Sequence, residues 1–384
     1  MSKEGGFSNS VDLIRTVAIV GVILLHASND YTVQQMSWFE IIRWNTVSVY
    51  QSLGRLGVPL FLMLTGFLLL QPSKFDESIE GFFKKRWARI GLPFVFWGAV
   101  YFAYDFFVVH NINGQPINSG SIIQGILTGP YYQFWYLYLL VGLYLLTPIL
   151  RVVMAQADRV LIKYLLVLWL LGTFILPFIY LLTPYQLDSN VLQFTGYAGY
   201  FILGAFLVTV QIRRLWLAIL TSLGVALTAI GTYVLAATVG GKEMYWFQLY
   251  FSPTLILASA ALFMLLMTVQ KPFGVHSPPI LTPSIQPSPN LMSPENHSEA
   301  VSKTSGQSKG RKLLAVISAN TLGLFLLHPM VLDALQKGYF GFTINGNTLN
   351  SVASVPLNTA IVLFVSLGIL LALKRIPGLK KLIG

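Results

Sequence analysis

Long apolar stretches alternate with short polar ones along almost the whole chain. A helix that crosses the hydrocarbon core of a membrane needs about 20 largely apolar residues. About ten segments of the 384-residue chain meet this requirement, and the short second one has its flank 41–53 as a candidate extension. The expected helices lie near 11–29, 54–70, 90–110, 132–150, 161–182, 191–210, 215–239, 250–270, 313–333 and 356–374. The pattern predicts an all-α fold, a polytopic membrane helix bundle with about ten transmembrane helices.

The basic residues between these segments are distributed unevenly. Of the 25 Lys and Arg residues, twenty lie in one alternating set of loops, four lie in the other set, and Arg15 lies inside the first segment. Lys and Arg accumulate in the loops that stay in the cytoplasm. We therefore expect both termini in the cytoplasm and an even number of spans. Because the first apolar run contains Arg15 and lacks a small-residue cleavage site, we interpret it as a retained span rather than a signal peptide.

Composition narrows the class of protein further. The chain is 55% hydrophobic and 10% charged, with a mean hydropathy of +0.67, whereas a soluble domain carries about 25% charged residues. It has no cysteine, which excludes disulfides, thiolate catalysis and thiolate metal sites. The net charge of +11 would suit nucleic acid, but the basic residues are spread between apolar segments. We expect a multi-pass protein of the cell membrane with membrane lipids, and no nucleic acid, as partners.

One segment differs in composition from the rest. Residues 271–312 are rich in Pro and Ser and poor in large apolar residues, which is typical of a disordered linker. We expect a cytoplasmic linker there, with the first eight spans and their loops in 1–270. Residues 313–384 then hold the last two spans of the same domain and a basic tail.

Two ionisable residues lie inside the first expected span, VDLIRTVAIVGVILLHASND. Arg15 and His26 are eleven positions apart, which places both on one helix face with a rise of about 16 Å between them. Ionisable residues within a membrane are costly and commonly functional. The competing interpretation is that Arg15 reaches headgroups while His26 bonds a neighbouring helix. Asp12 lies one turn before Arg15 and Asp30 one turn after His26, so each is a candidate for local pairing with its neighbour. Asp30 either orients the imidazole of His26 or is simply the first solvated residue.

The positions of the other histidines and of the basic run 81–93 indicate which of them are candidate site residues. His328 lies well inside the ninth span, before Pro329, and His110 closes the third span, where an interfacial role is favoured. Two further histidines fall in the linker, and the widely separated set predicts no metal site. Arg86 and Arg89 in GFFKKRWARIGLP, residues 81–93, either flank a span near lipid headgroups or bind phosphate oxygens of a soluble molecule.

Taken together, these stretches resemble the integral-membrane acyltransferase-3 family, which contains many O-acetyltransferases of surface glycans. The resemblance rests on the spacing of Arg15 and His26, on GVPLFLMLTGFLL (57–69), on KKRWARIGLPFVFW (84–97), and on FWYLYLLVGLYLLTPIL (134–150) and ISANTLGLFLLHP (317–329). The stretch 57–69 has Thr65 where the family usually has Ser. The order of these motifs along the chain is that of the family.

The resemblance implies an enzyme that takes an acyl group, commonly acetyl, from cytoplasmic acyl-CoA. The acceptor would be a hydroxyl of a glycan or lipid-linked sugar near the external face. His26 becomes the catalytic histidine, as general base or as transient acyl carrier, with Asp30 as helper. Arg15, Arg86 and Arg89 become candidates for holding CoA.

Three points stay open at this stage. The donors to the tetrahedral oxyanion are unassigned, with His328, Tyr136 and Tyr138 as candidates. Many relatives carry a soluble hydrolase-like domain, and without one we expect the reaction within the membrane domain. A transporter or flippase of polysaccharide intermediates is the competing class, a catalytically inactive relative is a third, and the sequence leaves a homodimer open.

Overall fold

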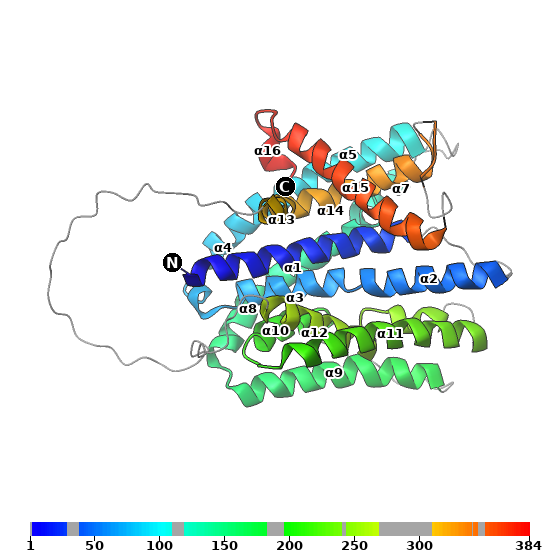
Figure 1. Cartoon of the computed structure of the whole chain (residues 1–384). Coiled ribbons are helices and arrows are strands. Elements are labelled where there is room, and N and C mark those ends of the chain that lie inside the picture. The colour runs from blue at the N-terminus through cyan, green and yellow to red at the C-terminus, as the bar shows by residue number, and fades with distance from the viewer. Residues whose placement is uncertain are drawn as a thin grey trace.

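The computed structural model describes residues 2–28, 38–109, 119–182, 196–239, 243–268, 309–339, 341–344 and 350–384. Every regular element within these ranges is a helix, and the helices pack as one bundle (Figure 1). The expectation of an all-α, polytopic membrane bundle is confirmed. Asp30, His110 and residues 271–308 of the expected linker 271–312 lie outside the described residues, so the predictions made for them stay predictions. Residues 309–312 belong to the helix Lys309–Ala319.

Seven helical stretches of the described chain are long and apolar enough to cross a membrane. They are Asn9–Ala27, Asn45–Leu69, Ile79–Val108, Phe134–Gln156, Arg214–Thr238, Tyr245–Met267 and Ser351–Leu373. A bent pair, α13 (Lys309–Ala319) and α14 (Thr321–Gln336), adds an eighth if it counts as one span. Helix α9 (Arg159–Leu182) coincides with the fifth expected span, and α10 (Ala198–Leu207) is a shorter apolar helix. The count of ten spans and the cytoplasmic termini remain predictions.

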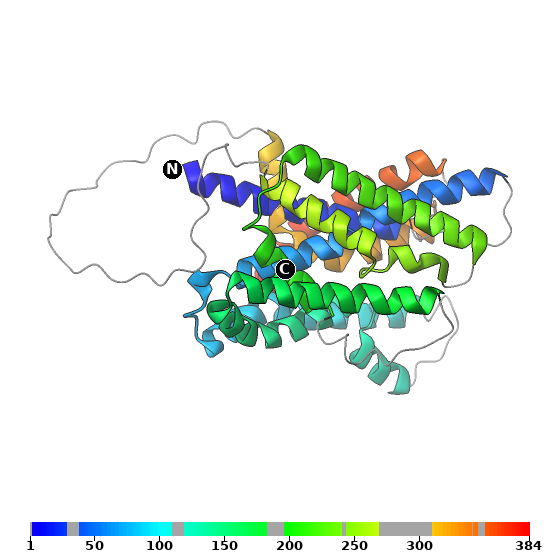
Figure 2. The same ribbon diagram turned by 90° about the horizontal axis from the view of Figure 1, so that it is seen from below.

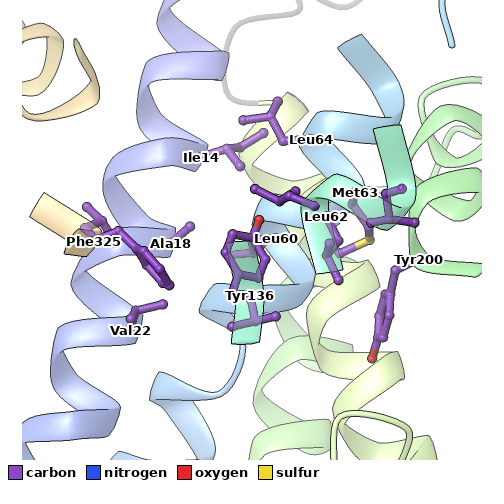
Figure 3. Packing of buried hydrophobic residues seen from close by; sticks show 14 of the residues in the cluster. Ile14, Ala18, Val22, Leu60, Leu62, Met63, Leu64, Tyr136, Tyr200 and Phe325 are labelled. Carbon is purple, nitrogen blue, oxygen red and sulfur yellow. The ribbon is translucent and has the colours of Figure 1, made fainter. Parts of the chain in front are cut away.

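Helix α1 (Ser2–Ala27) occupies the middle of the bundle. It contacts α2 (Trp38–Gly54), α3 (Gly57–Leu69), α12 (Pro253–Thr268), α13, α14 and α15 (Ser351–Leu373), and it lies between α14 and α3 in Figure 1. Its buried side chains Ile14, Ala18 and Val22 face the core, where Ala18 and Val22 lie near Phe325 of α14 (Figure 3). A helix that is covered on several sides in this way holds its polar side chains in fixed surroundings.

The second expected span is a broken helix. Helices α2 and α3 meet at Arg55 and Leu56, and together they form the stretch Asn45–Leu69, so the flank 41–53 does extend this span from residue 45 onward. A Cβ on Gly54 would lie 2.7 Å from the backbone nitrogen of Leu25, and one on Gly57 would lie 2.5 Å from the carbonyl oxygen of Ala18. The glycines therefore allow the break to press directly against the backbone of α1.

Helices α13 and α14 add a bend that was not expected. Residues 313–333 were expected to form one span, and the two helices at this place meet at an angle of 79° at Asn320. The backbone of Asn320 leaves the helical region (φ −108°, ψ 11°), and its side chain Nδ2 donates to the carbonyl oxygen of Val316 at 2.7 Å. Asn competes with the helix for backbone hydrogen bonds, which provides a physical reason for the bend.

The remaining helices complete the bundle around this centre. Helices α4 (Ile79–Arg86) and α5 (Leu92–Tyr104) are joined by a π-helical turn, Trp87–Gly91, and α7 (Ser119–Thr128) precedes α8 (Phe134–Gln156). Helix α11 (Arg214–Thr238) packs on α12, and a short 3-10 helix, Glu243–Gln248, lies between them. Helix α4 and the N-terminus of α1 lie at the same end of the bundle in both views (Figures 1 and 2). We call this the basic end, because it carries Arg15, Lys84, Lys85, Arg86 and Arg89.

Candidate active site

A cavity of about 370 Å³ lies at the basic end. Its walls include four cationic side chains: Arg15, Lys74, Arg86 and Arg89. The three arginines expected to hold CoA are thus brought together, although they come from α1, α4 and the π-helical turn. Arg15 also lies within electrostatic range of Arg89. Like charges held close to each other in a partly buried cavity favour the binding of an anion.

The loop between α3 and α4 is fixed by ion pairs. Arg151 of α8 donates from Nη2 to Glu77 Oε2 at 3.0 Å and from Nε to the carbonyl oxygen of Leu69 at 3.0 Å. Lys85 donates to the other oxygen of Glu77 at 2.7 Å. The hydrogen bond from Lys85, with a further contribution from Arg151, holds the pKa of Glu77 below its ordinary value. These bonds to Glu77 and Leu69 hold the loop that also carries Lys74, a residue of the cavity wall.

The inner part of the cavity is aromatic and apolar. Phe61, Tyr136 and Phe325 line it, and the rings of Tyr136 and Phe325 are 5.2 Å apart between centroids. The ring of Phe325 in turn lies 6.0 Å from the ring of His328. The cavity therefore ends one aromatic ring away from His328. Of the two tyrosines that are candidate donors to the oxyanion, Tyr136 lines this cavity and Tyr138 does not. The hydroxyl of Tyr138 donates to the carbonyl oxygen of Ile126.

Two predicted site histidines form a pair behind Phe325. The rings of His26 and His328 are stacked, with centroids 5.4 Å apart and an interplanar angle of 29°. The side chain of His328 is fully buried, and its Nδ1 lies 3.0 Å from the carbonyl oxygen of Leu324. Because a carbonyl oxygen only accepts, Nδ1 carries the proton. The Nε2 atom of His328 is then a lone-pair acceptor, and it has no hydrogen-bond partner among the described residues.

A polar network lies beside this pair and was not predicted as part of the site. The carboxylate of Asp333 accepts hydrogen bonds from Tyr131, from Tyr104 at 3.2 Å and from Lys337 at 3.0 Å. The neighbouring Tyr132 places its ring 4.7 Å from the ring of His26. The network therefore fixes the turn that holds Tyr132 against the histidine. An acidic residue at the end of an otherwise apolar span was the available signal in the sequence.

Asp12 has a structural partner in the fold. Expected as a local partner of Arg15, it accepts a hydrogen bond from Ser318 Oγ at 2.6 Å. This bond ties α1 to the end of α13, directly before the bend. No group of three or more His, Asp or Glu side chains that could hold a metal ion is found within the described ranges.

The fold and this site define a class: a multi-pass helical membrane protein in which a basic cavity leads to a buried histidine pair. The acyltransferase-3 family, described as an acyltransferase domain, matches residues 8–375, and the chain belongs to this family. The resemblance inferred from the motifs is therefore confirmed.

A more specific similarity covers only part of the chain. The succinoglycan biosynthesis protein ExoH of Rhizobium meliloti (strain 1021) is 25% identical over 128 residues, which are 33% of this chain and 34% of that relative. The aligned part thus spans about a third of the relative's length. No solved structure matches the chain. The family and this relative support membrane acyltransferase activity.

Proposed function

We propose that this protein moves an acyl group, commonly acetyl, from acyl-CoA bound at the basic end to a hydroxyl of a glycan or lipid-linked sugar beside His26 and His328. We call the region around these two residues the histidine end. One observation carries the proposal: the cavity lined by Arg15, Arg86 and Arg89 extends inward to Phe325, which contacts His328. An anion-binding entrance and a buried base at the two ends of one path suit a long donor with phosphates at one end and a thioester at the other.

The basic end supplies the groups that a nucleotide requires. Guanidinium groups bind phosphate oxygens through parallel hydrogen bonds. Arg86 lies over the rings of Phe82 and Tyr144, at 5.4 and 5.9 Å from their centroids, and its Nε has no hydrogen-bond partner among the described residues. Its planar group is therefore held in place by the rings and retains a donor for a phosphate. The apolar inner walls suit the pantetheine arm and the acyl group.

The histidine pair supplies the base. His26 takes the proton of the acceptor hydroxyl as the oxygen attacks the thioester carbonyl. The tetrahedral intermediate then collapses, the carbon–sulfur bond breaks, and the proton passes to the departing CoA thiolate. Transient acylation of His26 itself is the alternative route. Tyr132, whose ring contacts His26, and Tyr136 in the inner wall are candidate hydroxyl donors for this chemistry.

The direction of transfer follows from the topology expected from the sequence. With the termini in the cytoplasm, the basic end faces cytoplasmic acyl-CoA and the histidine end lies toward the outside of the cell membrane. Arg15 and His26, about 16 Å apart along α1, then mark the two ends of the path that the donor occupies.

Acetyl transfer from labelled acetyl-CoA tests the proposal. Purified protein with a panel of glycan and lipid-linked acceptors is compared with His26→Ala and, as a matched control, with His297→Ala in the segment 271–312. We expect His26→Ala to lower kcat by about 10²–10⁴-fold, the range for loss of a general base, while the affinity for acetyl-CoA is retained. If neither thioester cleavage nor label transfer depends on His26 with any acceptor, the transporter or flippase is the better interpretation.

A further inference from the structure

The break in the second span places Arg55 at the histidine end. Arg55 lies between α2 and α3, where Gly54 presses against the backbone of Leu25, the residue next to His26. In the same region the side chain of Gln51 donates to the carbonyl oxygen of Ser28 at 3.5 Å. Arg55 does not line the cavity at the basic end. Its position therefore connects it to the acceptor side of the proposed reaction rather than to the donor.

Arg55 is partly buried, yet no carboxylate pairs with it in the described part of the chain. Its Cζ atom lies 5.8 Å from the centroid of the Tyr250 ring, and its Nε has no hydrogen-bond partner there. Burying an unpaired charge within a membrane protein is costly, and a contact with an aromatic face offsets only part of that cost. An anion bound to the guanidinium group would offset the rest of this cost.

Tyr250 lies under the guanidinium group of Arg55, and Tyr197 is within electrostatic range of it. Trp135 packs on both tyrosine rings, and we call Trp135, Tyr197 and Tyr250 the aromatic triad. The ring centroids of Trp135 lie 5.8 Å from those of Tyr197 and of Tyr250, and the two tyrosine rings are 6.2 Å apart. Trp135 retains 36% exposure, so part of its indole remains open to a ligand. Flat aromatic faces stack against the C–H face of a sugar ring, while an indole N–H and phenol hydroxyls supply hydrogen bonds.

The triad also adjoins the donor path. Trp135 precedes Tyr136 on α8, the rings of the two residues are 6.0 Å apart, and Tyr136 lines the donor cavity. A sugar on the triad would therefore lie one residue away from the wall of that cavity. The backbone contact of Gly54 places the same region beside His26.

We propose that Arg55 and the aromatic triad form the acceptor subsite and that the acceptor carries an anionic group, which Arg55 binds. Resting on the acyltransferase function proposed above, this inference narrows the acceptor to a sugar with a carboxylate or with a phosphate. The anion pairs with the guanidinium group, the sugar ring stacks on the triad, and a neighbouring hydroxyl faces His26. Neutral sugars stack on the same rings but leave the guanidinium group unpaired.

Binding measurements test the subsite without requiring turnover. The probes are a β-1,4-glucan tetrasaccharide, the same tetrasaccharide with its C6 hydroxymethyl groups oxidised to carboxylates, and a polyprenyl pyrophosphate monosaccharide. Calorimetry with the full chain in nanodiscs compares wild type, Arg55→Gln, Arg55→Lys and the control Arg213→Gln, at an exposed arginine just before α11. We expect at least one anionic probe to bind wild type about tenfold or more tightly than the neutral tetrasaccharide, as for a charge-assisted hydrogen bond. This preference is lost in Arg55→Gln and partly kept in Arg55→Lys.

The outcomes separate the two proposals. A preference for the oxidised tetrasaccharide identifies a carboxylate, and a preference for the pyrophosphate probe alone identifies the carrier phosphate. Equal binding of the anionic and neutral probes to wild type, or an unchanged preference in Arg55→Gln, overturns the subsite. Acetyl-CoA titrated into the same preparations reports on the donor side: its failure to bind wild type contradicts the proposed function, whereas normal donor binding to Arg55→Gln shows that this variant is folded.

Discussion

Buried arginines at the basic end perform two different tasks, and their hydrogen bonds distinguish them. Arg151 is satisfied by Glu77 and by the carbonyl oxygen of Leu69, and it also lies 4.7 Å from the centroid of the Phe82 ring. Arg86 lies over the same ring one turn after Phe82 on α4; it lines the cavity, and its Nε has no hydrogen-bond partner among the described residues. We infer that Arg151 holds the loop in place and that Arg86 is available to a ligand.

The donor site predicts a selective effect of removing one charge. Replacing Arg86 or Arg89 by Gln removes a charge-assisted hydrogen bond to phosphate, and we expect the KM for acetyl-CoA to rise about tenfold in each variant with little change in kcat. Steady-state kinetics over a range of donor concentrations measure the split. Arg213→Gln, an exposed arginine just before α11, is the matched control. A fall in kcat at unchanged KM would argue against a donor-binding role.

Among single residues, the sequence predicted those site residues that the chemistry of the side chain and its spacing identify. Arg15, His26, Arg86 and Arg89 were selected in this way, and the structure places the arginines in one cavity. The network around Asp333 was missed because its tyrosine partners, Tyr104 and Tyr131, lie more than 200 positions away in the sequence. No periodicity within one helix reports a contact of that kind. Asp30 is not described, so its role as helper to His26 remains a prediction.

Among the elements, α3 and α10 show how glycine sets the approach of two helices. A Cβ on Gly66 would lie 1.9 Å from the carbonyl oxygen of Phe201, and one on Gly204 would lie 2.0 Å from that of Met63. The two glycines are reciprocal, because each accommodates the backbone of the other helix. Small residues drive such contacts in membranes, where apolar burial between helices contributes little. Since α3 also carries Phe61 and Thr65 of the cavity wall, this contact supports the site.

An added methyl group tests this contact. In Gly66→Ala or Gly204→Ala the new Cβ meets backbone that cannot rotate away, so the helices must separate, at a cost of about 1–3 kcal/mol. We expect a lower Tm in detergent and a reduced affinity for acetyl-CoA. Gly142→Ala on α8 is the control, since nothing lies within 4 Å of its added Cβ. Equal Tm values for the Gly66 and Gly142 variants would show that the close approach is not required.

The elements also show what hydropathy can and cannot predict. Each expected span has a helix at its place in the described part of the chain, because about 20 apolar residues must satisfy their backbone within the helix. The breaks at Arg55 and at Asn320 were not specified, although the glycines of the second span suggested an irregular segment. Both depend on backbone contacts or side-chain bonds that hydropathy does not contain. They matter for function, since one places Arg55 and the other precedes the helix that carries His328.

For the whole molecule, orientation decides which substrate meets which end. The chain has no cysteine, so single cysteines can be introduced without removing any. Lys84→Cys reports on the basic end and Gln124→Cys on α7 reports on the opposite end; both side chains are exposed. In intact cells we expect a membrane-impermeant maleimide to label Gln124→Cys only, and to label Lys84→Cys only after permeabilisation, because basic loops remain in the cytoplasm.

The same orientation has a consequence for turnover that labelling alone does not test. Proteoliposomes with the acceptor enclosed and the basic end outward should transfer label from acetyl-CoA added to the outside. Vesicles sorted by cysteine accessibility into the opposite orientation should not, because the nucleotide cannot cross the bilayer and its cationic site lies at one end only. Transfer that is equal in the two populations, or labelling of Lys84→Cys in intact cells, would contradict a path from a cytoplasmic donor to an external acceptor. Transfer in one population alone would place the acyl group's passage through the bundle, between Arg15 and His26.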